Sequence, residues 1–178
     1  GVAPVSWKLQ ERIQSLPTRI YATYGMTETI THIAVKPLNR SAGQKILPGN
    51  RSLSKEGYTG LPGVSFHTDE RGCLLVRCPR ISDKEIVTND LVELTSENSF
   101  TWLGRVDNVI NSGGLKLMPE TIEEKFSRCF SGRFFAAGLP DPELGERLIF
   151  VVEGEPETGL LNRLRTCQAQ SKGEITKN

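Results

Sequence analysis

Residues 21–32, YATYGMTETITH, join an apolar, β-prone run to a glycine-led polar loop. Of all the features of the sequence, this junction says most about the fold class. The run Arg19–Tyr24 predicts a strand. A helix from about Ser6 to Ser15, ended by Pro17, is expected before it, with Leu9, Ile13 and Leu16 inward. A helix, a strand and a Gly-led loop in succession are typical of an α/β protein. Such folds bind ligands in loops that leave the ends of strands, so we expect a ligand site near Gly25.

The middle of the chain favours short strands and turns. Residues 36–72 are rich in Gly, Pro, Ser and charged residues. The tip DERG, residues 69–72, predicts a hairpin turn, with Cys73–Arg77 as the returning strand. Further strands are expected at Ile86–Thr88, Leu91–Leu94 and Phe100–Leu103.

The pattern changes near Arg105–Asp107, where we expect a domain boundary. The segment GRVDNVINSGGLKLMPETIEEKF passes from a polar turn through a glycine pair into a helix. Pro119 suits the first position of that helix, and the glutamates that follow favour its start. The buried stripe of that helix is predicted to be Ile122, Phe126 and Cys129/Phe130. Glu123 and Glu124 are interpreted as a solvated helix face, the alternative being an acid/base pair. Strands are expected in FFAAGL and RLIFVVEG, and a last helix from about Glu157 to Gln170 with Leu160, Leu161, Leu164 and Cys167 inward.

Charge and composition exclude several classes of function. The formal net charge is +1, from 22 basic and 21 acidic residues, which disfavours binding of nucleic acid by a basic face. No stretch approaches the roughly 18 apolar residues of a membrane helix. The chain has four scattered cysteines and two histidines, so we expect reduced thiols, a cytoplasmic location and no His-rich metal site.

The glycine-led loop carries residue types that suit a nucleotide and a metal ion. Gly25 allows close approach of backbone. Thr27 and Thr29 offer hydroxyls to phosphate oxygens, and Glu28 offers a hard oxygen to Mg²⁺. Tyr24 offers a flat face to a base. The alternative is a plain turn with a helix cap.

Two later clusters could complete such a site. Asp90 follows a short β-like run, and its carboxylate could accept hydrogen bonds from two ribose hydroxyls. The alternative is an ordinary turn aspartate. In GRVDNVINSGGLK, Arg105 supplies a fork of donors, while Gly113 and Gly114 supply flexible backbone. Asp107 lies at the expected boundary, and the alternative for this segment is a solvated connector.

Five segments stand in order along the chain: GVAPVS, YGMTET, TNDL, GRVDNVINSGGLKLMPETIEE and AAGLPDPELGE. Together they resemble the GGAP, YGxTE, TGD, GRxD/K-to-PxxIE and VxGxPDxxxGE motifs of the adenylate-forming superfamily. That superfamily includes acyl-CoA synthetases, peptide-synthetase adenylation domains and luciferases. The resemblance spans about residues 1–152, with Asn89 where the TGD motif has glycine.

The resemblance implies an ATP-dependent acid–thiol ligase. Its substrates would be a small carboxylic acid, ATP with Mg²⁺, and coenzyme A. It implies an α/β fold in which residues 1–104 end a large AMP-binding domain and residues 105–178 begin an α+β small domain. The resemblance implies a role for each motif residue. Gly1, Ala3, Pro4 and Tyr24 border the adenine, and Gly25 belongs to the same nucleotide-binding set. Thr27 contacts the α-phosphate, Glu28 binds Mg²⁺, and Asp90, assisted by Arg105, holds the ribose. Asp107 is the hinge, and Ser112, Gly113 and Gly114 enter the site for thioester formation.

Two motifs of the superfamily are missing from these residues. The phosphate loop TSGTTGxPK does not occur, and neither does the late PxTxxGK motif, for which Lys172 is a poor candidate. We therefore expect a fragment that is inactive alone. The short segment before Asp90 most resembles bacterial o-succinylbenzoate–CoA ligases of menaquinone synthesis. The alternatives are another acyl-CoA synthetase, a carrier-protein adenylation domain, and a nucleotide-binding module without chemistry. His32, just past the YGMTET motif, could face the acyl group or be an ordinary packed or solvated residue.

Overall fold

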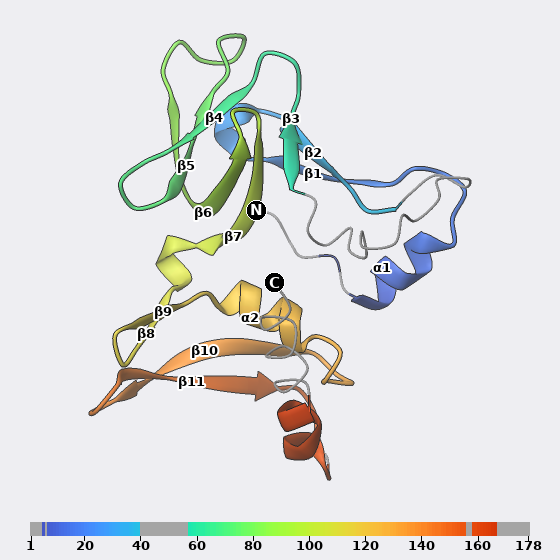
Figure 1. The fold of residues 1–178 in the computed structure, drawn as a ribbon, viewed down its shortest axis with the longest axis vertical. Helices are drawn as coiled ribbons and strands as arrows, with labels where there is room; N and C mark the ends of the chain where they lie inside the picture. The colour runs from blue at the N-terminus through green and yellow to red at the C-terminus, as the bar shows by residue number, and fades with distance from the viewer. Residues whose placement is uncertain (1–4, 6, 40–56, 156–157, 167–178) are drawn as a thin grey trace. The chain divides into compact units, whose positions relative to one another are not determined.

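The computed structural model describes residues 5, 7–39, 57–155 and 158–166, and its chain divides into two compact units, Gly1–Val106 and Asp107–Asn178 (Figure 1). Each unit has its own antiparallel sheet. Because the two units are separate bodies, each is described by itself.

The first unit contains a seven-stranded sheet with the order β1-β2-β3-β7-β6-β5-β4. Every pair of neighbouring strands is antiparallel. Its elements are α1 (Trp7–Gln14), β1 (Tyr21–Gly25), the 3₁₀ turn η1 (Thr27–Thr29), β2 (His32–Pro37), β3 (Tyr58–Gly60), β4 (Ser65–Thr68), β5 (Cys73–Arg77), β6 (Ile86–Ser96) and β7 (Ser99–Arg105).

The predicted hairpin at residues 69–72 is confirmed. Strands β4 and β5 pair from Ser65↔Arg77 to Thr68↔Leu74, and the Asp69 N–H donates to the Cys73 carbonyl. The prediction of separate strands at 86–88 and 91–94 is wrong, because β6 runs through both. The pairing of β6 with β7 shifts register between Leu91 and Val92, but the strand continues through this point. Asp90 therefore lies within a strand and not at the end of one.

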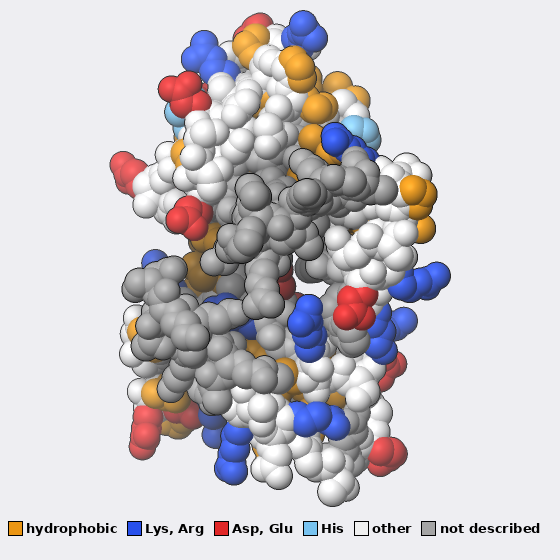
Figure 2. Space-filling view, turned by 45° about the vertical axis from the view of Figure 1, so that its right-hand side comes forward, with side chains coloured by type: hydrophobic (Ala, Val, Ile, Leu, Met, Phe, Trp, Pro, Cys, Tyr) orange, Lys and Arg blue, Asp and Glu red, His pale blue; other side chains and the backbone are white. Residues whose placement is uncertain are grey.

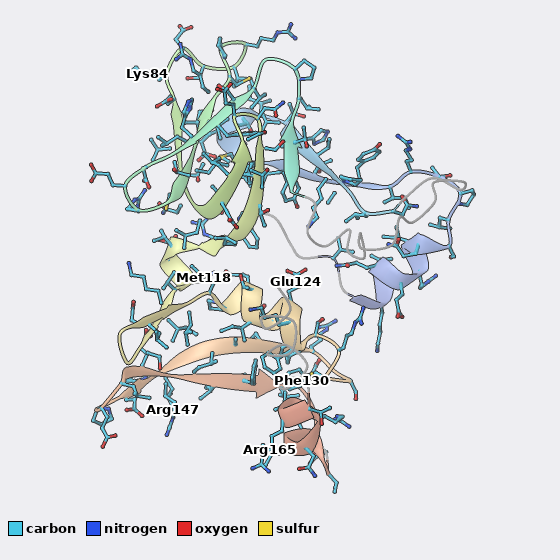
Figure 3. All side chains as sticks on the ribbon, viewed as in Figure 1. Lys84, Met118, Glu124, Phe130, Arg147 and Arg165 are labelled. Atoms are coloured by element: carbon cyan, nitrogen blue, oxygen red, sulfur yellow. The ribbon has the colours of Figure 1, made fainter. Side chains whose placement is uncertain are left out.

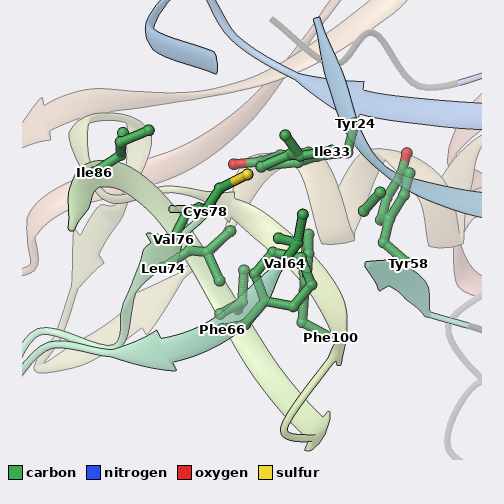
Figure 4. Close-up of a cluster of buried hydrophobic side chains, with 12 residues drawn as sticks. Tyr24, Ile33, Tyr58, Val64, Phe66, Leu74, Val76, Cys78, Ile86 and Phe100 are labelled. Carbon is green, nitrogen blue, oxygen red and sulfur yellow. The ribbon is translucent and has the colours of Figure 1, made fainter. Parts of the chain in front are cut away.

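All seven strands contribute to one hydrophobic core, shown in Figure 4. Its fully buried members include Tyr24 from β1, Ile33 from β2, Phe66 from β4, Leu74 from β5 and Phe100 from β7. Strands β1 and β6 are four positions apart in the sheet order, which in a flat sheet means roughly 19 Å. The contact between Tyr24 and Asp90 described below therefore requires the sheet to curve strongly around this core.

Asn39 ties the predicted N-terminal helix to the sheet. Its side chain is 3% exposed; Nδ2 donates to the carbonyls of Ile13 and Thr18, and Oδ1 accepts from the Ile20 N–H. The helix itself is confirmed at Trp7–Gln14, whereas Ser6 lies outside the described residues. Of the three apolar positions predicted to face inward, only Ile13 is buried; Leu9 and Leu16 are exposed, because a helix of about two turns brings few side chains to the core.

The second unit contains a four-stranded sheet with the order β10-β11-β8-β9, and α2 packs against β10. The predicted helix start is confirmed, with Pro119 in its first turn. Phe126 and Phe130 pack with Phe134 and Phe150, and Figure 3 shows Phe130 close to the sheet and Glu124 directed away from it. The elements are η3 (Val106–Asn108), β8 (Ile110–Ser112), β9 (Leu115–Leu117), α2 (Pro119–Phe126), β10 (Phe134–Asp141) and β11 (Gly145–Val152).

Glu123 is not a solvated partner of Glu124. Its Oε1 accepts the backbone N–H of Ala136 at 2.8 Å, on the edge strand β10. An edge strand presents backbone donors that its own sheet leaves unpaired, and Glu123 satisfies one of them from α2. The prediction of a solvated side chain holds for Glu124 alone.

The last described residues form a helical turn at 160–166, inside the predicted range. Leu160 and Leu164 are half-buried, but Leu161 is 72% exposed and does not face inward. Cys73 and Cys78 are buried and take no part in a disulfide. Cys129 is disulfide-bonded, so the prediction of four reduced thiols is wrong for this residue; Cys167 lies outside the described residues.

The described surface carries mixed charge. Acidic and basic side chains are interspersed on the face shown in Figure 2. Among the described residues, no helix combines the length and the hydropathy needed to cross a membrane.

Candidate functional site

The glycine-led loop connects two antiparallel strands, β1 and β2, through the short turn η1. Gly25 stands at a register shift, where a Cβ would lie 2.5 Å from the Thr31 carbonyl oxygen and 2.9 Å from the His32 Cα. The close approach predicted for Gly25 is thus made by the chain's own returning backbone. A larger residue at this position would force the two arms of the loop apart.

Thr29 holds the loop together from inside. Its side chain is fully buried, accepts the Met26 N–H at 3.0 Å and lies within hydrogen-bonding distance of the Met26 and Thr31 carbonyls. The prediction that the Thr29 hydroxyl meets a phosphate is therefore wrong, because the hydroxyl is used within the loop. Thr27 and Glu28, its neighbours in η1, are exposed and free to meet a ligand.

The residue that leaves this turn has an unusual backbone. Ile30 has φ +62° and ψ −37°, and its side chain is 86% exposed. Positive φ is costly for a β-branched residue, so the surrounding hydrogen bonds must impose this conformation. The turn that presents Thr27 and Glu28 is consequently held in one shape. The predicted neighbour His32 begins β2 and is exposed.

Tyr24 and Asp90 meet although 66 residues separate them in the chain. The Tyr24 hydroxyl donates to Asp90 Oδ2 at 2.5 Å. Burial, and then the hydrogen bond to the Asp90 carboxylate, raise the pKa of Tyr24 far above its usual value, so the hydroxyl keeps its proton. Tyr24 is 1% exposed, with Phe100 and Tyr58 against its ring. The expected open ring face for a base is therefore covered in this structure.

Arg105 approaches the same carboxylate from the neighbouring strand. Asp90 on β6 pairs with Arg105 on β7, and Arg105 Nη1 lies 3.7 Å from Asp90 Oδ1. The Asp90 side chain is 13% exposed and that of Arg105 is 46% exposed. One carboxylate oxygen thus meets a buried hydroxyl, while the other faces a cation at the surface. The sequence clusters around Tyr24, Asp90 and Arg105 are brought together here.

Sequence reasoning did not identify Arg71, which also lies beside this group. Its guanidinium pairs with Asp69 at 2.8 Å and reaches β6, where it lies 3.4 Å from the Asn89 Oδ1 and from the Thr88 carbonyl oxygen. Asn89 replaces the glycine of the TGD motif. This difference from the motif is the one sequence feature that could have pointed to a side-chain contact with Arg71 at this position. The contact joins the β4–β5 turn to the strand that carries Asp90.

In the second unit, the glycine pair forms a tight hairpin. Ser112 pairs with Leu115, so Gly113 and Gly114 are a two-residue turn with φ +56° and +82°. Such a turn needs positive φ at both positions, which glycine tolerates best. The loop predicted to be flexible is therefore a defined β-turn. Asp107, the predicted hinge residue, is exposed within η3.

Several predicted site residues cannot be placed. Gly1, Ala3, Pro4 and Lys172 lie outside the described residues. Over the described ranges, no three His, Cys, Asp or Glu side chains converge to form a metal site. Glu28 is exposed and offers a single carboxylate, which fits a Mg²⁺ ion that takes its remaining ligands from nucleotide phosphates and water.

Comparison with known proteins identifies a consistent group of relatives, although no protein-family model matches the chain. The chain is 26% identical over 136 residues to a medium/long-chain-fatty-acid–CoA/3-oxocholest-4-en-26-oate–CoA ligase of Mycolicibacterium smegmatis. It is 26% identical over 167 residues to a 2-succinylbenzoate–CoA ligase of Salmonella typhimurium. These matches cover 75% and 91% of the chain, but the chain spans only 24% and 36% of the two relatives' lengths.

One solved structure is similar to most of this chain in sequence and in fold. It is an acyl-CoA synthetase (AMP-forming)/AMP-acid ligase II-like protein from Dyadobacter fermentans. Its TM-score is 0.51 at 37% identity, and the match covers 94% of this chain and 46% of that protein. The mixed α/β fold is thus confirmed, and the relatives are AMP-forming CoA ligases, which supports a relationship to the adenylate-forming superfamily.

Proposed function

We propose that the chain is part of an ATP-dependent acid–thiol ligase that adenylates a carboxylic acid and transfers the acyl group to coenzyme A. The observation that carries the proposal is the Asp90 carboxylate, held by Tyr24 on one oxygen and flanked by Arg105 at the other. A fixed carboxylate with a partly exposed oxygen is suited to accept hydrogen bonds from the hydroxyls of a ribose.

The two steps balance without an additional reactant. In the first, an oxygen of the substrate carboxylate attacks the α-phosphorus of ATP, and pyrophosphate leaves. In the second, the thiol of coenzyme A attacks the acyl carbon, and AMP leaves. A free carboxylate resists attack because it is anionic and resonance-stabilised, and conversion to a mixed anhydride removes both obstacles.

The proposed roles follow the motifs of the sequence. Thr27 donates its hydroxyl to the α-phosphate, and Glu28 contributes an oxygen to Mg²⁺. When bound, the ion supplies positive charge that offsets the charge developing on the phosphate oxygens. Asp90 and Arg105 hold the ribose. Gly1, Ala3, Pro4, Tyr24 and Gly25 border the adenine, with the Tyr24 contribution limited to its hydroxyl edge.

The second unit is assigned to the thioester step. The rigid hairpin at Ser112, Gly113 and Gly114 would enter the site when coenzyme A reacts, and Asp107 would be the hinge between the half-reactions. In this proposal, residues 1–104 end the large domain and residues 105–178 begin the small domain. A gating motion of this type lets one site serve two chemical steps.

For the acid, we propose o-succinylbenzoate, which would place the enzyme in menaquinone synthesis. Similarity to the Salmonella typhimurium 2-succinylbenzoate–CoA ligase over 91% of the chain supports this choice. Similarity to the Mycolicibacterium smegmatis ligase supports a second candidate, a fatty or sterol-derived acid. The two candidates differ in size and polarity, so a substrate panel separates them.

The test uses the full-length protein that carries this chain. ATP–pyrophosphate exchange and AMP release are measured with o-succinylbenzoate, a medium-chain fatty acid and 3-oxocholest-4-en-26-oate, each with and without coenzyme A. The proposal expects exchange with the correct acid alone and AMP release only when coenzyme A is added. Exchange with a fatty acid but not with o-succinylbenzoate would overturn the substrate assignment, and nucleotide binding without exchange would indicate a module without chemistry.

A further inference from the structure

A polar network runs from the core of the first unit to the Asp90 carboxylate. The Tyr24 hydroxyl donates to Asp90 Oδ2 at 2.5 Å, and the Thr88 side chain lies beside the Tyr24 hydroxyl. Thr88 Oγ1 also accepts the backbone N–H of Asp90 at 3.1 Å. Tyr24 and Thr88 are 1% and 7% exposed, so both contacts are shielded from water.

The surrounding core holds the Tyr24 ring. Phe100 meets it edge-on, with ring centres 5.1 Å apart and planes at 78°, and Tyr58 lies 5.7 Å away at 55°. Figure 4 shows the three rings among the aliphatic side chains of the curved sheet. Because the ring cannot turn without disturbing this packing, the hydroxyl has a defined position before any ligand arrives.

This arrangement makes the two carboxylate oxygens of Asp90 unequal. Oδ2 accepts a strong, buried hydrogen bond, while Oδ1 lies 3.7 Å from Arg105 Nη1, beyond ordinary hydrogen-bonding distance. Oδ1 therefore keeps acceptor capacity on the partly exposed side. Without the Tyr24 hydroxyl, the Asp90 carboxylate could rotate about its Cβ–Cγ bond. A bound nucleotide would then have to fix the orientation of the carboxylate.

We propose that Tyr24 and Thr88 are positioning residues that orient the Asp90 carboxylate toward the two hydroxyls of the ribose. The inference rests on the proposed function, since it needs a nucleotide at Asp90. In this proposal Tyr24 acts through its hydroxyl group. An aromatic residue that stacked on the base would act through its ring instead, and would not need a hydroxyl. Preorganisation of this kind raises affinity because the ordering cost is met during folding.

The test compares two nucleotides that differ only at the ribose. Affinities for AMP and for 2′,3′-dideoxy-AMP are measured on the full-length protein, its Tyr24→Phe variant and a Tyr58→Phe control from the same aromatic cluster. Tyr24→Phe should weaken AMP binding about tenfold, the loss of one charge-assisted hydrogen bond, and change dideoxy-AMP binding less than about twofold. Tyr58→Phe should leave both affinities within about twofold.

A second pair of variants separates orientation from general damage to the core. Thr88→Val removes the hydroxyl at constant shape and should also reduce the preference for AMP, while Thr88→Ser should restore it. Equal losses for AMP and dideoxy-AMP in Tyr24→Phe, or an unchanged preference, would overturn the positioning role alone. A wild-type protein that binds the two nucleotides equally would overturn the ribose contact, and the proposed function with it.

Discussion

The backbone N–H of Gly113 donates to the carbonyl of Leu144 at 2.8 Å, so the β8–β9 turn is tied to the β10–β11 turn. Ser112 and Gly145 pair directly beside this bond. The glycine-pair motif and the GLPDPELGE motif, whose bonded residues Gly113 and Leu144 are 31 positions apart in the sequence, thus build one local structure. A turn braced in this way has a defined shape.

Alanine at Gly113 should destabilise the second unit more than alanine at Gly114. Both glycines have positive φ, which costs roughly 1–2 kcal/mol for a residue with a Cβ. At Gly113 the Cβ would also lie 3.2 Å from the Leu144 Cδ2, whereas at Gly114 nothing lies within 4 Å. Denaturant unfolding of the two variants measures the difference, and an equal or smaller effect at Gly113 would contradict the brace.

Thr29→Val should lower the stability of the first unit more than Thr27→Val does. Valine keeps the shape of Thr29 but leaves the Met26 N–H without its buried acceptor, which should lower the free energy of unfolding by about 2 kcal/mol. Thr27 is exposed, so its replacement should change stability by less than about 0.5 kcal/mol. Thermal unfolding gives the first comparison, and pyrophosphate exchange should be reduced directly by Thr27→Val if that hydroxyl meets the α-phosphate.

Glu28→Gln should raise the Mg²⁺ concentration needed for adenylation and reduce its rate roughly 100-fold. The variant keeps size and hydrogen-bonding capacity but loses the negative charge that a divalent ion requires. Glu70→Gln removes an exposed charge from the β4–β5 turn and is the matched control. Pyrophosphate release is followed as Mg²⁺ is varied, and an unchanged Mg²⁺ dependence would remove Glu28 from the metal role.

Asp69→Asn should destabilise the β4–β5 hairpin only where the carboxylate is charged. The N–H groups of Cys73 and Arg71 and the Arg71 guanidinium donate to Asp69, and they hold its pKa below the usual value of 3.8. A lowered folded-state pKa adds stability that is complete above the unfolded value and is lost as pH falls through the folded value.

The Asp69 effect has a defined pH window. The difference in unfolding temperature between wild type and Asp69→Asn should be constant above about pH 5 and shrink below about pH 4. Asp83→Asn, at an exposed aspartate in the loop between β5 and β6, is the control. A difference for Asp69→Asn that persists unchanged in acid would show that the carboxylate charge is not involved.

Local features could be predicted from the sequence because they depend on neighbours in the chain. The turn at residues 69–72 follows from its own Asp and Gly, which supply the cap and the positive φ. The start of α2 follows from Pro119. Thr29 and Thr27 carry the same hydroxyl, so the sequence predicts a phosphate contact for both, and only burial distinguishes them.

The sequence by itself determined local features such as the turn at residues 69–72 and the start of α2, and the order of motifs that resembles adenylate-forming enzymes. The tertiary structure decided which motif residues meet. Tyr24 and Asp90 lie on strands four positions apart, and they touch because the packing of side chains from all seven strands curves the sheet around one core. Curvature is the summed result of many contacts between distant residues, so no stretch of sequence encodes it alone.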